Sequence, residues 1–199
     1  VDYGQEALEI AENVKIPSDE IKRSINISLN GIGNIYQSLE QYDLAIKQFK
    51  KSMQLESELV NELGIAINHQ NIGECQESKG RVKEALESFR TSLAYNNEID
   101  SEKGKILCSY SIAHVYVHMG RTNEAHDMLQ DALSRAKELG DKSIVSNVEI
   151  NLGWTLLNLK KFKQAKEHLN SGLQIAQNVN LPSQIAEANK FLSDLAIAQ

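Results

Sequence analysis

Residues 32–49 read IGNIYQSLEQYDLAIKQF, and this order of small, aromatic and aliphatic residues returns along the chain at an interval of 40 residues. Four copies align without a gap, starting at Leu29, His69, Ser109 and Glu149. Within each half of a copy, apolar residues recur three, four and seven positions apart, which is the stripe of an amphipathic helix and not the alternation of a strand. The sequence therefore predicts an all-α fold built from repeated helix pairs.

The columns of this alignment indicate how the helices pack. Small residues recur where two backbones come close, and a large apolar residue then fills the space between neighbouring helices. The small columns are Gly33, Gly73, Ala113 and Gly153, and Ala45, Ala85, Ala125 and Ala165; the large column is Phe49, Phe89, Leu129 and Leu169.

Turn residues separate the helices at fixed places. Gly80 and Gly120 stand where a first helix is expected to end in a left-handed residue, and Glu40 and Lys160 occupy the same column. Between copies, Asp100, Gly140 and Asn180 share one column, and Ser101 and Asp141 follow as predicted N-caps.

This order resembles the tetratricopeptide repeat, whose pattern runs through Leu-Gly, Tyr, Ala, Phe and a small residue. The matching residues of the first copy are Ile32, Gly33, Tyr36, Tyr42, Ala45, Phe49 and Ser52. The Trp that leads the family pattern is replaced by Leu29, His69, Ser109 and Glu149, and the closing Pro is missing. The 40-residue period is similar to that of kinesin light chain, Leu-Gly-Asn-type scaffolds, and the repeat regions of bacterial sensor kinases and pheromone receptors. The resemblance implies a right-handed α-solenoid of stacked antiparallel helix pairs; HEAT-like pairs share the period but do not require this residue order.

We expect one solenoid over residues 1–199. Its predicted parts are a partial preceding unit at 1–25, full repeats at 26–65, 66–105, 106–145 and 146–185, and the first helix of a further unit at 186–199. Pro17 is expected to open a long first helix. Because the chain begins at Val1 and its last helical pattern has no cap, we interpret it as a piece of a longer protein. The apolar residues Ile185, Phe191, Leu192 and Leu195 would lack a covering partner there, which predicts weak self-association through the C-terminal helix.

Composition excludes several classes of partner. The net charge of -6 and a pI near 5.4 argue against nucleic acid and against an anionic membrane, which both require a basic surface. No apolar stretch is long enough to span a membrane and no secretory pattern opens the chain, so a cytoplasmic location is favoured. Cys75 and Cys108 are expected to be buried apolar side chains.

The resemblance implies that the first helices line a concave groove that binds a protein or peptide. Carried over to this sequence, the peptide-binding candidates are Asn30, Asn34, Asn71, Tyr110, His114, His118, Asn151, Trp154 and Asn158. A ladder of asparagines can hold a peptide backbone at several points, but the same side chains can instead bond within the scaffold. Trp154 is expected either to anchor a partner or to pack between repeats.

The lining columns also predict a gradient. The first two repeats supply polar and acidic residues, namely Asn30, Gly31, Asn34, Gln37, Gln70, Asn71, Glu74 and Glu77, whereas the last two supply aromatic and apolar ones. None of these columns holds the Lys or Arg that chaperone-binding relatives use as a carboxylate clamp. A ligand that is polar or basic at one end and apolar at the other would fit.

Catalytic and metal chemistry receive little support. His114 and His118 lie four apart, a spacing that can ligate a metal, but the intervening VYV lacks the Glu of the hydrolytic zinc motif, so contact with a peptide or a structural role is favoured. His126 and His168 are expected to be solvated. With no phosphate-binding loop, nucleophile elbow or preorganised carboxylate pair in the sequence, we predict no enzymatic activity, no metal and no cofactor.

Two functions remain open from the sequence. The first is a scaffold that binds proteins or peptides. The alternative is a sensory or regulatory input domain of a larger bacterial signalling protein, such as a sensor histidine kinase, a transcription regulator or a pheromone-responsive regulator. A solenoid that only acts as a spacer is a third, weaker interpretation.

Overall fold

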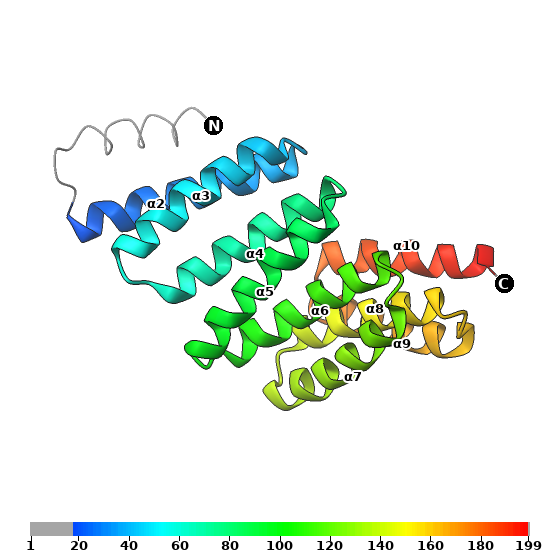
Figure 1. The fold of residues 1–199 in the computed structure, drawn as a ribbon. Coiled ribbons are helices and arrows are strands. Elements are labelled where there is room, and N and C mark those ends of the chain that lie inside the picture. The colour runs from blue at the N-terminus through cyan, green and yellow to red at the C-terminus, as the bar shows by residue number, and fades with distance from the viewer. Residues whose placement is uncertain (1–17, 199) are drawn as a thin grey trace. The chain divides into compact units, whose positions relative to one another are not determined.

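The computed structural model describes residues 18–198, and in this range it contains α-helices and no strand (Figure 1). The predicted all-α fold of stacked antiparallel helix pairs is confirmed. The chain divides into two compact units, Val1–Asp100 and Ser101–Gln199, each of which is described by itself.

Between residues 18 and 100, unit 1 contains two helix pairs. Their bounds are α2 Asp19–Ser38, α3 Tyr42–Glu58, α4 Glu62–Ser78 and α5 Val82–Glu98. Unit 2 contains two further pairs and a last single helix. The bounds there are α6 Glu102–His118, α7 Thr122–Leu139, α8 Lys142–Asn158, α9 Phe162–Asn178 and α10 Pro182–Ala198.

The predicted repeat boundaries do not coincide with the ends of helices. Each of them falls inside a first helix: 26 in α2, 66 in α4, 106 in α6, 146 in α8 and 186 in α10. A self-alignment fixes the period but not the point at which a repeat begins. Residues 19–25, which the predicted division placed in a preceding unit, are the start of α2, which is capped by the Ser18 hydroxyl. The long first helix expected in this part of the chain therefore begins at Asp19. The rest of that prediction, including Pro17, lies outside the described residues.

The small columns bring helices close together, as predicted. A Cβ atom added at Gly33 would lie 2.5 Å from the Phe49 ring, and one added at Gly73 would lie 2.5 Å from the Phe89 ring. In unit 2 the corresponding Cβ at Gly153 would lie 2.6 Å from Leu169. The phenyl and leucine side chains therefore fill the space that the glycines leave, and each large residue is fully buried.

Each turn places one residue in the left-handed region. Gly80 and Gly120 have φ of 72° and 76°, and Glu40 and Lys160 adopt the same conformation with φ of 58° each. The turns between one helix pair and the next also place a residue in the left-handed region, and one of these residues is Val60, with φ of 53°. Ser101 and Asp141 cap their helices as predicted, since their side chains accept hydrogen bonds from Gly104 and from Ser143 and Ile144.

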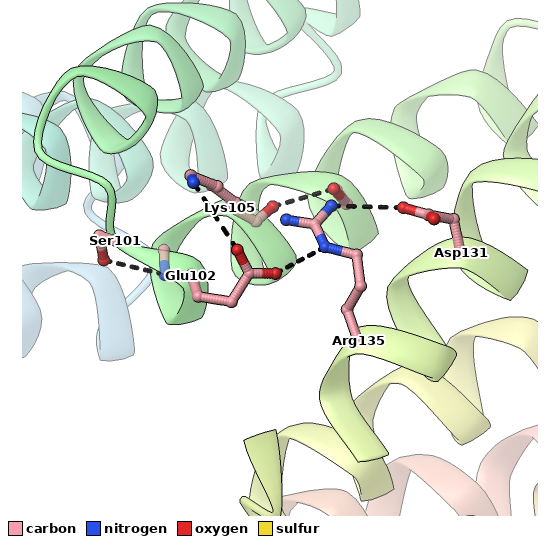
Figure 2. A network of polar contacts seen from close by, with 7 residues as sticks. Ser101, Glu102, Lys105, Asp131 and Arg135 are labelled. Carbon is pink, nitrogen blue, oxygen red and sulfur yellow. Dashed lines mark hydrogen bonds and ion pairs between the residues drawn. The ribbon is translucent and has the colours of Figure 1, made fainter. Parts of the chain in front are cut away.

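Ion pairs connect the two helices of the first pair in unit 2. Figure 2 shows Arg135 of α7 between Glu102 of α6 and Asp131 of its own helix, with Nε–Oε1 and NH1–Oδ2 distances of 2.6 and 3.3 Å. Lys105 approaches the other oxygen of Glu102 at 3.7 Å. The hydrogen bond from Arg135 is the main reason why the pKa of Glu102 is lowered.

The C-terminal helix is better covered than predicted. Phe191 and Leu195 are 6% and 2% exposed, because α10 packs on both α9 and α8. The expectation that both residues lack a covering partner is therefore wrong. Ile185 and Leu192 are half-buried, and Ile197 is exposed.

Both cysteines are buried free thiols, as predicted. Cys75 packs with Ala45, Phe49 and Ile72 in the core of unit 1. Burial raises the pKa of its thiol to about 11, which disfavours the reactive thiolate.

Candidate functional site

In unit 2 the first helices α6, α8 and α10 lie side by side, and four rings from them form one cluster. The Trp154 ring stacks on His114 with centroids 4.3 Å apart and planes at 23°, and on Phe191 with centroids 5.7 Å apart and planes at 26°. His118 completes the group, with its ring centroid 4.8 Å from that of His114 and 5.5 Å from that of Trp154. We call His114, His118, Trp154 and Phe191 the aromatic cluster.

The cluster brings together three residues that the sequence selected as binding candidates. Trp154 is half-buried, with ring neighbours supplied by α6 and α10, so the packing contact between repeats is present in the structure. A role of Trp154 as an anchor for a partner stays a prediction. His118 is exposed and His114 is half-buried.

Charged groups from α10 flank the aromatic cluster. Burial raises the pKa of Glu187, against the opposing influence of His114 and Lys190. The Lys190 ammonium lies 5.8 Å from the centre of the Phe191 ring, within reach of a cation–π interaction. The sequence analysis missed Glu187 and Lys190 because it treated α10 as an uncovered end.

The first helices of unit 1 carry a different surface. On α4, Leu63, Ile67, Gln70 and Glu74 follow one another at intervals of three or four residues and therefore share a face. On α2, Ile27, Asn34 and Gln37 follow at intervals of seven and three residues and also share a face. A hydrogen bond of 3.2 Å from Gln37 Nε2 to Glu74 Oε2 joins the two rows. We call these residues, with Asn71 and Glu77, the first-helix surface of unit 1.

The predicted asparagine ladder divides into two groups. Asn30, Asn151 and Asn158 donate hydrogen bonds inside the scaffold, to the Ser52 hydroxyl at 2.8 Å and to the carbonyls of Asn147 and Trp154 at 2.9 Å each. Asn34 is exposed and Asn71 is half-buried, and neither side chain forms a hydrogen bond with another residue in 18–198. Only the latter two fit the arrangement expected for holding a peptide backbone. Tyr110, the remaining candidate, is half-buried on α6.

Unit 1 also contains a buried polar network that sequence reasoning missed. The Glu56 carboxylate is 5% exposed and accepts hydrogen bonds from the amides of Asn26 and Asn61. The Ser52 hydroxyl donates to Asn26, and it accepts from Asn68 at 2.9 Å. These contacts connect α2, α3 and α4, so the network is part of the scaffold.

A second buried carboxylate, Glu149, lies in unit 2. It is 4% exposed and pairs with Lys137 Nζ at 3.2 Å and His168 Nδ1 at 2.6 Å. Burial alone would raise the pKa of Glu149, but the hydrogen bonds from His168 and Lys137 outweigh it and lower the pKa. The expectation that His168 is solvated is therefore wrong. His126, expected to be solvated as well, is partly buried beside Asp127, with 17% of its side chain exposed.

The family model named tetratricopeptide repeat matches residues 24–98 and 105–178. The chain belongs to the tetratricopeptide repeat family. The comparison with curated protein sequences found no match.

Three solved structures illustrate the proteins that share this fold. BtubC from P. vanneervenii is 17% identical with a TM-score of 0.71, over 89% of this chain and 72% of that one. A Rap protein complexed with competence and sporulation factor is 15% identical with a TM-score of 0.76, over 91% of this chain and 50% of that one. A signal transduction ATPase with a tetratricopeptide repeat sensor, from Pyrococcus horikoshii, is 18% identical with a TM-score of 0.70, over 92% of this chain and 28% of that one. At such identities the likeness shows the fold alone, and the chain spans only half of the Rap protein and about a quarter of the ATPase.

None of the helices within residues 18–198 has the length and apolar character needed to cross a membrane.

Proposed function

We propose that this tetratricopeptide repeat chain is a non-enzymatic scaffold that binds peptide segments of other proteins through its first helices. The observation that carries the proposal is the aromatic cluster of unit 2. Three helices there bring four rings together, with His118 exposed and the half-buried Trp154 beside it. Partly exposed aromatic side chains are the usual anchors of a protein partner.

The experiment is a selection from a random peptide library, followed by measurement of the affinity of the selected peptides for variants of the whole chain. We expect Trp154→Leu and His118→Ala to weaken binding by about tenfold or more, the loss typical of an interface anchor. Leu139→Ala is the matched control, because Leu139 is an exposed apolar residue on the second helix α7. Selected peptides that bind all three variants as tightly as the unmodified chain would contradict the proposal.

A second candidate function is a sensory input domain of a larger signalling protein in the cytoplasm. It is supported by the P. horikoshii ATPase, of which this chain covers 28% and whose repeats are described as a sensor. Reading the sequence that flanks this chain in its genome distinguishes the two functions. A kinase, ATPase or DNA-binding segment on the same polypeptide favours the sensor, and its absence there favours the free scaffold.

We also propose weak self-association through α10. Ile197 is 83% exposed, and Ile185 and Leu192 are half-buried on the same helix. Light scattering over a range of concentrations tests this proposal. A mass that stays that of one chain at high concentration, equal to that of an Ile197→Ser variant, would overturn it.

A further inference from the structure

The first-helix surface of unit 1 has an apolar row that is open to solvent. Ile27 is 74% exposed, and Leu63 and Ile67 are 47% and 49% exposed. Large aliphatic side chains grouped on one surface, and not scattered singly, mark an interaction site. On α4, the face that begins with Leu63 and Ile67 continues through Gln70 to Glu74.

Glu74 gives this surface a carboxylate that is held by hydrogen bonds at both oxygens. Its carboxylate accepts one hydrogen bond at each oxygen, from Gln37 Nε2 and from Gln70 Nε2, both at 3.2 Å. Within residues 18–198 it forms no ion pair. Burial raises the pKa of Glu74 despite the two amide donors, and the charge of Glu77 raises it further. The carboxylate is therefore oriented but not neutralised.

The charged group that acts on Glu74 is Glu77, which has the same sign. Helix α4 contains Glu62, Glu74 and Glu77 and no Lys or Arg, and α2 contains no Lys or Arg after Arg23. An anionic partner would be repelled here. A purely apolar partner would bury the carboxylate more deeply without a counter-ion, which is strongly unfavourable.

We propose that the first-helix surface of unit 1 docks a cationic amphipathic segment of a partner protein. An Arg or Lys side chain of the segment pairs with Glu74, and its aliphatic side chains cover Ile27, Leu63 and Ile67. Asn34 and Asn71, which lie on the same surface, supply donors and acceptors for polar groups of the segment. This inference rests on the proposed function and adds the chemistry of the ligand that the first helices of unit 1 would take.

The test measures fluorescence anisotropy of labelled synthetic peptides with the whole chain. The first probe is an amphipathic peptide of leucine and arginine, and the second replaces every arginine by glutamate. We expect the leucine–arginine peptide to bind and the leucine–glutamate peptide to bind at least tenfold more weakly, because the sign of its charge is reversed. Equal binding of both peptides would overturn the inference.

Variants locate the binding. Ile27→Ser removes a largely exposed side chain, so folding is unaffected, and we expect a loss of about tenfold for the leucine–arginine peptide from the apolar contact. Glu74→Gln keeps hydrogen-bonding capacity but removes the charge, and should lower the affinity about tenfold and reduce its dependence on salt. The matched controls are Leu44→Ser and Glu87→Gln, exposed residues on the second helices α3 and α5, which should bind as the unmodified chain does.

Dependence on pH is an independent readout. A cation pairs only with ionised Glu74, so affinity should fall as the pH drops through the raised pKa of this group, that is, already above the ordinary value of 4.5. The Glu74→Gln variant should lack this step. A step of the same size in the variant would contradict the role of Glu74.

A Trp154→Leu variant separates this inference from the proposed function. If Trp154→Leu abolishes binding of the leucine–arginine peptide while Ile27→Ser and Glu74→Gln do not weaken it, the inference fails and the aromatic cluster remains the binding site. If none of these variants binds more weakly, both fail. Binding of the chain to vesicles of anionic lipid, with no binding of the peptide, would identify a membrane as the partner and would also overturn the inference.

Discussion

Among residues 18–198, each unit buries one carboxylate almost completely, and the two are held in opposite ways. Glu56 in unit 1 and Glu149 in unit 2 are 5% and 4% exposed. Glu56 accepts hydrogen bonds from two neutral amides, those of Asn26 and Asn61. Glu149 instead pairs with two groups that can carry positive charge, Lys137 and His168.

The difference shows two routes by which a helical repeat can bury an acid. Amide donors offset the cost of burying a carboxylate only through well-placed hydrogen bonds. The stability of such a site therefore depends on the packing that holds every donor in position. Partners that can carry positive charge instead lower the pKa of the carboxylate, so the site responds to pH through that pKa. Unit 1 should therefore be sensitive to changes of volume, and unit 2 to changes of pH.

The largest effect is expected from a change of volume beside Glu56. A Cβ atom at Gly64 would lie 2.2 Å from the carboxylate carbon of Glu56, so Gly64→Ala has to displace the buried acid from its amide donors. We expect the free energy of unfolding to fall by about 3 kcal/mol, the upper range for overpacking combined with lost hydrogen bonds. Urea denaturation followed by circular dichroism measures it.

Gly31→Ala is the matched control, because a Cβ there meets nothing within 4 Å and Gly31 also lies inside a helix. It should raise the free energy of unfolding by about 1 kcal/mol through helix propensity. If the two variants are equally stable, the carboxylate is not fixed against Gly64 and the shape argument for unit 1 is wrong.

The second largest change in the free energy of unfolding is expected when Glu149 in unit 2 loses one of its partners, Lys137 or His168. His168→Ala removes the hydrogen bond to Glu149 and should lower the free energy of unfolding by about 2 kcal/mol at neutral pH, as for other hydrogen bonds to charged groups. The lowered pKa of Glu149 means that its contribution is present above 4.5 and is lost as the pH falls below that value through the lowered pKa. His168→Ala should make this loss in acid smaller. Trp154, the single Trp of the chain, reports the unfolding of unit 2 by fluorescence.

His126→Ala is the control for this prediction, because the acid beside His126 is its chain neighbour Asp127, 83% exposed. A change below about 0.5 kcal/mol is expected there. Equal losses in both variants would show that the buried position of Glu149 does not matter.

The sequence predicted the features that depend on neighbours along the chain. The 40-residue period, the small columns at Gly33 and Gly73, and the caps Ser101 and Asp141 follow from helical periodicity and local hydrogen bonding, and the structure confirms them. The predicted repeat boundaries fall within helices because a periodic pattern has no marked origin.

Contacts between residues far apart in the sequence could not be predicted from the sequence alone. Glu149 and His168 meet across two helices, and nothing in either helix alone marks the pair. The exposed row of Ile27, Leu63 and Ile67 was missed because an aliphatic residue in a helical stripe is normally assigned to the core. The candidates Asn151 and Asn158 looked like binding residues by type, but their amides bond to carbonyls one turn back on their own helix.

The smallest change in the free energy of unfolding is expected in the turns that lead from one helix pair to the next. Val60 in unit 1 has φ of 53°, whereas Gly140 occupies the same column in unit 2 with φ of 74°. A β-branched residue in the left-handed region costs about 1 kcal/mol or more, and Val60 is 81% exposed, so burial does not offset that cost. Val60→Gly should therefore raise the free energy of unfolding by about 1 kcal/mol, and Gly140→Val should lower it by a similar amount, both measured by urea denaturation. The reciprocal pair separates backbone strain from the general flexibility of glycine, because flexibility alone would make Val60→Gly the less stable protein and Gly140→Val the more stable one.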